Sequence, residues 1–145
     1  MSFQNAPKAL RQVLLADAAT CLAAGALMTV ASGPIAGVTA IPQGLLFYAG
    51  LILFPVAAFM ASIATRATMH PAAIALIVAG NAAWLAASLW LIVGEVIAPN
   101  GLGQAFIGAQ AAIVALLTVL EWRFSRQQST TACLSTSHDQ TIKCI

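Results

Sequence analysis

The stretch AAIALIVAGNAAWLAASLWLIV, residues 72–93, contains no charged side chain. An α-helix rises about 1.5 Å per residue, so roughly 20 apolar residues cross the hydrocarbon core of a bilayer, which is about 30 Å thick. The whole chain of 145 residues has the same character, because 61% of its residues are hydrophobic and 7% are charged. A typical soluble domain is roughly half apolar and about 25% charged. Residues 72–93 therefore predict a transmembrane helix.

Three other runs, residues 13–31, 45–64 and 105–120, are comparably apolar. With their flanks, the four runs predict transmembrane helices at about residues 8–32, 44–66, 71–94 and 103–124. The runs lack the alternation of apolar and polar residues that is typical of the strands of a membrane β-barrel. The connections between the runs are short, which favours antiparallel packing of helices that follow each other in the sequence. The predicted fold is an all-α polytopic membrane protein, an antiparallel four-helix bundle of two hairpins. An Ala-rich soluble bundle and a signal peptide in the first run are less favoured alternatives.

The basic residues are distributed unevenly between the two sides of the predicted bundle. The six Lys and Arg residues are Lys8, Arg11, Arg66, Arg123, Arg126 and Lys143. The loops at residues 33–44 and 95–104 contain none. Because cytoplasmic loops of membrane proteins are enriched in Lys and Arg, we expect both termini in the cytoplasm of a plasma (bacterial inner) membrane. Residues 1–124 then form the membrane domain, and the polar residues 125–145 form a disordered cytoplasmic tail.

The first and third predicted helices begin with a similar pattern. Pro7 is followed ten residues later by Asp17-Ala18-Ala19, and Pro71 is followed ten residues later by Asn81-Ala82-Ala83. Parallel repeats of this kind occur in membrane proteins. The pattern suggests that the two hairpins arose by tandem duplication, with Asp17 and Asn81 in equivalent positions. Chance matches in an Ala-rich chain are the alternative.

Asp17 is the most informative residue, because a carboxylate inside a membrane span costs a few kcal/mol unless it is paired or protonated. Arg66, Glu121 and Arg123 are expected at the same cytoplasmic side of the bundle. We therefore predict a polar network of Asp17, Arg66, Glu121 and Arg123. Its first interpretation is a structural ion-pair network, and the alternative is a site at which Asp17 binds a proton, a cation or a cationic substrate.

Further polar and helix-breaking residues fall near the predicted midplane. Pro55 should kink the second helix and free the carbonyl of Leu51, to which Asn81 could donate a hydrogen bond. The alternative is a midplane cavity. Its candidate lining residues are Asn81, Trp84, Tyr48, Ser88 and Gln110.

Several function classes find no support in the sequence. No Ser or Thr has a neighbouring base, no phosphate-binding loop is present, and no tight Cys pair suggests a metal site. Cys133, His138 and Cys144 could be imagined as metal ligands, but the favoured interpretation is an unstructured tail that happens to contain them. We therefore expect no catalytic residue, no metal and no cofactor, and a net charge of +2 gives no reason to expect nucleic acid as a partner. The expected partners are the lipid bilayer and a homo-oligomer or larger membrane complex.

Several features together resemble small uncharacterised bacterial inner-membrane proteins. The features are Asp17 in the first span, Gly80-Asn81-x-x-Trp84 in the third, and Leu120-Glu121-Trp122-Arg123 at the end of the fourth. The resemblance covers residues 7–126 and implies a four-helix membrane protein, but it brings no known activity. The first functional expectation is a non-enzymatic structural or accessory membrane subunit. The alternative is a small transporter or channel-like oligomer that uses Asp17 as a proton- or cation-binding carboxylate.

Overall fold

The computed structural model describes residues 8–66 and 69–142, with side chains described up to Ser125. Within these residues every regular element is a helix, and five are present. They are α1 (Lys8–Val30), α2 (Ser32–Thr39), α3 (Gln43–Ala64), α4 (Pro71–Val93) and α5 (Gly101–Ile142). Four segments are long and apolar enough to cross a membrane, namely α1, α3, α4 and Gly101–Ser125 of α5. The predicted all-α membrane bundle is confirmed.

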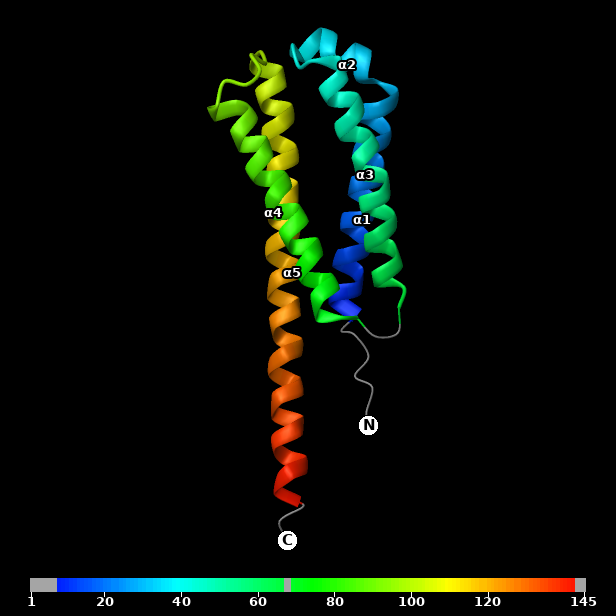
Figure 1. Ribbon diagram of the computed structural model, residues 1–145, viewed down its shortest axis with the longest axis vertical. Coiled ribbons are helices and arrows are strands. Elements are labelled where there is room, and N and C mark those ends of the chain that lie inside the picture. Colours follow the sequence, from blue (N-terminus) through cyan, green and yellow to red (C-terminus); the bar gives the residue numbers. More distant parts are fainter. Residues whose placement is uncertain (1–7, 67–68, 143–145) are drawn as a thin grey trace.

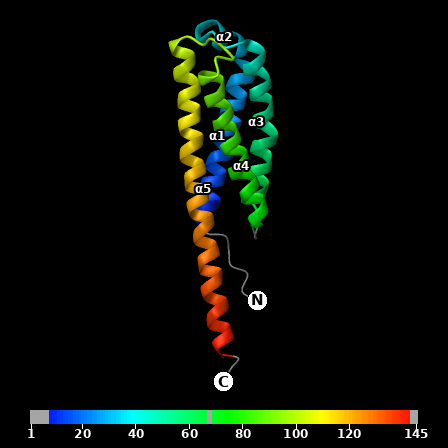
Figure 2. The same ribbon diagram turned by 60° about the vertical axis from the view of Figure 1, so that its left-hand side comes forward.

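The four long helices form two antiparallel hairpins that stand side by side (Figures 1 and 2). One hairpin consists of α1 and α3, which pack against each other most extensively, and the other consists of α4 and α5. The hairpins meet mainly where α5 packs against α1, whereas α3 and α4 have little direct contact. The short helix α2 covers the end of the bundle opposite the two chain termini (Figure 1). The least closed side of the bundle therefore lies between α3 and α4.

Two glycines allow the backbones of α1 and α3 to approach closely. A Cβ atom on Gly25 would lie 2.9 Å from the carbonyl oxygen of Gly50, and a Cβ atom on Gly50 would lie 2.7 Å from Oγ1 of Thr29. In lipid, where apolar helices gain nothing from leaving water, such close packing is a main source of helix association. The glycine contact therefore explains why α1 and α3 form the tighter of the two hairpins.

Asn100 ties the two hairpins together at the end of the bundle near α2. Its backbone N–H donates to the carbonyl of Thr39 (3.1 Å), and its side-chain amide donates to the carbonyl of Val38 (2.7 Å). Its side-chain oxygen accepts a hydrogen bond from the N–H of Gly103 (3.0 Å), as an N-cap residue does. A side chain on Gly103 would collide with the Thr39 carbonyl. We refer to these contacts of Asn100 as the Asn100 clasp.

Two parts of the fold differ from the sequence prediction. The segment expected as a loop at residues 33–44 contains α2, which restarts after a break at Ala31 and ends at Ala40 with a left-handed φ of 56°. The tail expected to be disordered continues α5 as far as Ile142. Residues 109–142 contain no Gly or Pro, and extending an existing helix avoids the cost of nucleating a new one. The backbone of residues 125–142 is therefore helical, where the sequence suggested an irregular tail.

We expect Gly50→Ala to lower the free energy of unfolding by roughly 1–3 kcal/mol, because the added methyl group must displace Thr29 or Met28. Gly108→Ala is the matched control, since nothing lies within 4 Å of the position its Cβ would take. Unfolding of each variant in detergent micelles, followed by circular dichroism, measures the difference. Equal stability of the two variants would contradict the close approach of α1 and α3.

Candidate functional site

Three polar side chains from three helices meet inside the bundle. Asp17 from α1 and Glu121 from α5 are completely buried, with 0% exposure, and Asn81 from α4 is 5% exposed. Asn81 is ten residues from Pro71, which places it about 15 Å along α4 and well inside the membrane span. We refer to Asp17, Asn81 and Glu121 as the carboxyl–amide cluster.

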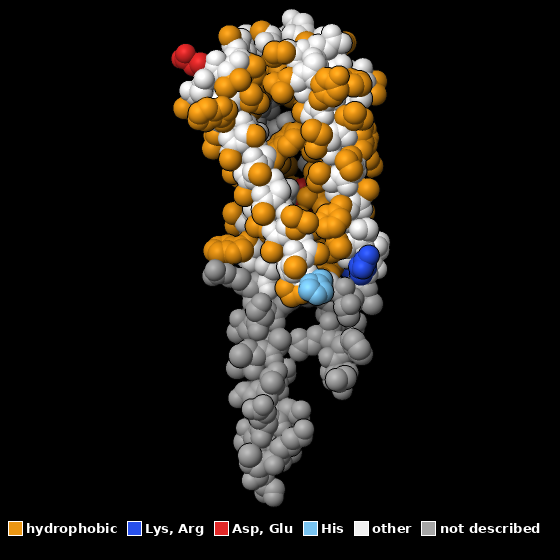
Figure 3. All heavy atoms as spheres, in the orientation of Figure 1, with side chains coloured by type: hydrophobic (Ala, Val, Ile, Leu, Met, Phe, Trp, Pro, Cys, Tyr) orange, Lys and Arg blue, Asp and Glu red, His pale blue; other side chains and the backbone are white. Residues whose placement is uncertain are grey.

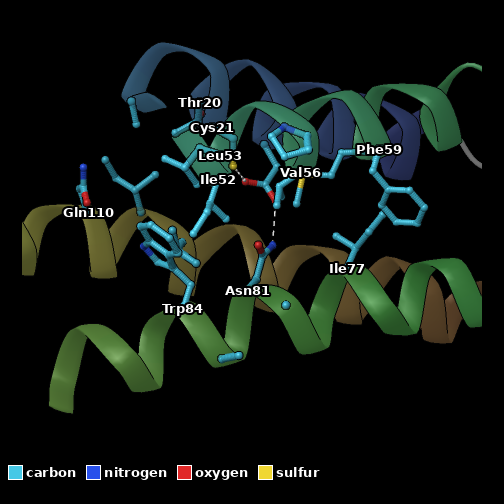
Figure 4. Close-up of a pocket in the computed structure, with 18 of the residues that line it drawn as sticks. Thr20, Cys21, Ile52, Leu53, Val56, Phe59, Ile77, Asn81, Trp84 and Gln110 are labelled. Carbon is cyan, nitrogen blue, oxygen red and sulfur yellow. Dashed lines mark hydrogen bonds between the residues drawn. The ribbon is translucent and has the colours of Figure 1, made fainter. Parts of the chain in front are cut away.

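The amide of Asn81 holds the cluster together. Its Nδ2 atom donates to Oδ2 of Asp17 at 2.7 Å and to Oε2 of Glu121 at 3.2 Å. A carboxylate only accepts hydrogen bonds, so the nitrogen of the amide must face the two carboxyl groups and both of its hydrogens are used. Figure 4 shows the bond from Asn81 crossing the space between α4 and α1. The thiol of Cys21 makes a longer contact of 3.8 Å with Oδ1 of Asp17.

The arginines predicted to neutralise the carboxyl groups lie elsewhere. Arg66 and Arg123 are exposed. Arg11 donates from Nη2 to the backbone carbonyl of Arg66 at 2.8 Å and so ties the start of α1 to the turn after α3. Among the side chains that the structure describes, no ion pair joins an arginine to Asp17 or Glu121. An amide therefore bridges the two carboxyl groups in place of the ion pairs expected from the sequence.

The cluster leaves one acidic oxygen without a partner. Oε1 of Glu121 is enclosed and receives no hydrogen bond within the described residues. Asp17 and Glu121 bond to the same nitrogen atom, so their carboxyl groups are neighbours. Two adjacent negative charges in a medium of low dielectric repel each other strongly, and a proton bound by the pair removes that repulsion. The arrangement is chemically suited to holding a proton or another cation.

A cavity of about 700 Å³ opens beside the cluster, with Asp17 and Asn81 in its wall. Its lining comes from α1, α3, α4 and α5 and is largely apolar. Two lining residues, Ile52 on α3 and Leu76 on α4, are also 56% and 61% exposed on the outside of the bundle. The cavity therefore opens between α3 and α4. Figure 3 shows this recess between the hairpins, with an acidic atom visible inside it.

The residues predicted to line one midplane cavity are distributed between two cavities, and one of them lines neither. Asn81, Trp84 and Gln110 line the large cavity. Trp84, Gln110 and Ser88 line a second cavity of about 150 Å³ on the α2 side. Tyr48 lines neither, because its side chain is 65% exposed and packs edge-on against Phe47, with 5.5 Å between the ring centroids.

Two further expectations concern α3: a kink at Pro55, and a hydrogen bond from Asn81 to the carbonyl of Leu51. Pro55 lies inside α3 and lines the large cavity. The hydrogen bond expected from Asn81 to the carbonyl of Leu51 is not formed, because both amide hydrogens of Asn81 are given to the carboxyl groups. A charge-assisted hydrogen bond is stronger than one to a neutral carbonyl, which explains the difference.

The two positions matched in the proposed internal repeat lie next to each other in the cluster. Asp17 and Asn81, the two residues in equivalent positions of the proposed repeat, are bonded directly to each other. Sequence reasoning missed Cys21 as a neighbour of Asp17. The signal was its spacing of four residues, which places both side chains on the same face of α1.

The described residues contain no group of three His, Cys, Asp or Glu side chains arranged to hold a metal ion. The side chains of Cys133, His138 and Cys144 lie outside the described residues. The fold and the cluster together define a helical integral membrane protein with a carboxyl pair enclosed within its spans. No protein-family model, curated protein or solved structure matches the chain.

Removing the bridging amide should destabilise the bundle. We expect Asn81→Ala to lower the free energy of unfolding by about 1–3 kcal/mol, because the carboxyl groups lose their shared donor. Ser88→Ala is a matched control on the same helix, since Ser88 is also buried but bonds only to the Trp84 carbonyl of its own helix. Unfolding in mixed micelles measures both variants. A loss in Ser88→Ala as large as that in Asn81→Ala would show that the bridge contributes nothing specific.

Proposed function

We propose that this protein is a small membrane transporter in which Asp17 and Glu121 bind and release a proton or a cation. One observation carries the proposal. Two completely buried carboxyl groups share a single amide beside a large cavity, and one of their oxygens has no hydrogen-bond partner among the side chains that the structure describes. Ionisable groups inside a membrane are costly and commonly mark ion or proton pathways.

The groups that face the carboxyl pair support this proposal. From α1 the thiol of Cys21 faces Asp17, from α4 the amide of Asn81 faces both carboxyl groups, and α5 contributes Glu121 itself. The only titratable residue of α3 is Tyr48, whose side chain is exposed. α1 carries two cations in its first turn: Lys8 is exposed, and Arg11, six residues before Asp17, donates to the carbonyl of Arg66 just beyond α3. A bound proton or cation would therefore be the main counter-charge of the pair.

A purely structural or accessory role explains less of the geometry. Such a role needs apolar helices that pack together, and replacing buried charged groups by apolar ones is often neutral or stabilising. The hydrogen bonds of Asn81 can stabilise the bundle, but that role requires neither two buried carboxyl groups nor the adjoining cavity. No catalytic step is part of the proposal. Kinship with small bacterial inner-membrane proteins, and assembly into an oligomer, remain proposals as well.

Infrared difference spectra recorded across a pH change test proton binding directly. The chain has four Asp and Glu residues, so a carboxylic C=O band can be assigned by substitution. We expect a band from the protonated pair that Asp17→Asn and Glu121→Gln each remove or shift. Glu95→Gln is the control, because Glu95 lies exposed in the loop between α4 and α5. A spectrum unchanged in both cluster variants would overturn the proposal.

We also propose that the protein lies in the plasma membrane with both termini in the cytoplasm, as the distribution of Lys and Arg favours. Single cysteines at Glu95 and His70, introduced into a chain without its native cysteines, mark the two ends of the bundle. Both positions are exposed. An impermeant maleimide should label Glu95→Cys in intact cells and His70→Cys only after the cells are opened. The reverse pattern would invert the topology.

A further inference from the structure

The geometry points to a specific ligand class for the large cavity: an amphipathic amine, held by its ammonium group at the carboxyl–amide cluster and entering from the lipid between α3 and α4. This inference rests on the proposed function and deepens it, because it names what the carboxyl pair recognises. It draws on four separate observations, which are the mouth of the cavity, the hydrogen-bonding groups at its inner wall, its apolar lining and its charge.

The mouth of the cavity faces the hydrocarbon of the membrane. The exposed lining residues Ile52, Phe59 and Leu76 belong to α3 and α4. These two helices have little direct contact with each other. At the α2 end, the Asn100 clasp ties the chain just before α5 to the end of α2. A ligand already dissolved in the lipid would therefore reach the cavity sideways and would not have to cross the clasp.

The polar groups at the inner wall near Asp17 already donate their hydrogens to acceptors within the protein. Asn81 donates both amide hydrogens to the carboxyl groups, and the thiol of Cys21 is directed at Asp17. The hydroxyl of Thr20 donates to the carbonyl of Ala16 on its own helix. Near Asp17 the acceptors that remain are therefore the carboxyl oxygens, whereas the indole of Trp84 and the amide of Gln110 lie further along the lining (Figure 4). A complementary ligand must supply N–H or O–H hydrogens.

The remainder of the lining favours an apolar body on the ligand. Aliphatic side chains from all four long helices cover most of the wall, and Trp84 and Phe59 add aromatic surface (Figure 4). A volume of about 700 Å³ lies in the range of pockets that hold small organic molecules, roughly 300–1,000 Å³. An inorganic cation would fill only a small part of this space and would leave the apolar wall unused.

The charge of the cluster selects an ammonium over a neutral alcohol. Asp17, Cys21, Asn81 and Glu121 are the groups that face the site, and none of them carries positive charge. An ammonium ion supplies both the missing charge and several N–H donors. Protons compete for the same carboxyl oxygens, so binding should weaken as the pH is lowered. A quaternary ammonium ion has the charge but no N–H group, and it should bind more weakly.

The test compares three probes of equal chain length: decylammonium, decyltrimethylammonium and decanol. The full chain is placed in phosphatidylcholine nanodiscs with Trp90→Phe and Trp122→Phe, so that the fluorescence of Trp84 in the cavity wall reports occupancy. We expect decylammonium to bind at least about tenfold more tightly than either other probe, because only decylammonium combines a positive charge with N–H groups that can donate to the carboxyl oxygens. Empty nanodiscs correct for partition into lipid.

Substitutions link the binding to the cluster. In the same background, Asp17→Asn should abolish the preference for decylammonium, whereas Glu95→Gln, which removes an exposed carboxylate, should preserve it. Equal affinity for decylammonium and decanol, or a preference that survives Asp17→Asn, would overturn the inference. If the infrared band shows that the pair binds a proton but no preference for decylammonium is found, the ligand class is wrong and the proposed function stands. If the unsubstituted protein shows no carboxylic band that depends on Asp17 or Glu121, both the ligand class and the proposed function are wrong.

Discussion

The amide of Asn81 between the carboxyl groups of Asp17 and Glu121 is the interaction on which the arrangement of the bundle depends. It is the polar link by which α4 reaches both α1 and α5 within the membrane span. Elsewhere in the spans the helices meet mainly through apolar and small side chains that pack closely, and a weaker polar contact joins Nε2 of Gln110 on α5 to Sδ of Met28 on α1 at 3.3 Å. A hydrogen bond to a carboxylate is directional and strong, so it fixes the rotation of each of the three helices about its own axis.

This link also explains how two hairpins can remain partly separated. The α1–α3 hairpin is closed by the contact of Gly25 with Gly50, and the Asn100 clasp joins the hairpins at one end. Beside the cluster, α3 and α4 have little direct contact, and the cavity between them extends on both sides of Asn81, from Gln110 and Trp84 to Ile77 and Phe59 (Figure 4).

The sequence was sufficient to predict the spans but not their orientation toward one another. Uncharged runs such as residues 72–93 determine membrane crossing locally, so the bounds of α1, α3 and α4 agree with the prediction within a few residues. The face that each helix turns inward is a different matter. Alanine, leucine and other apolar residues occur on every face of these helices, so no apolar stripe distinguishes one face from another. Partners therefore had to be inferred from charge, and Arg66 and Arg123 were the obvious cations for Asp17.

The structure shows why that inference failed for the arginines. Arg66 and Arg123 are exposed at the ends of their spans, where a guanidinium can remain hydrated, whereas Asp17 lies more than two turns inside α1. Drawing an arginine inward would require it to lose its water, and a neutral amide incurs a smaller penalty for the same position. Asn81 therefore satisfies the carboxyl groups geometrically without neutralising them. The negative charge of the two carboxyl groups therefore has no counter-charge from Asn81, and this is the physical basis for expecting a cation at this site.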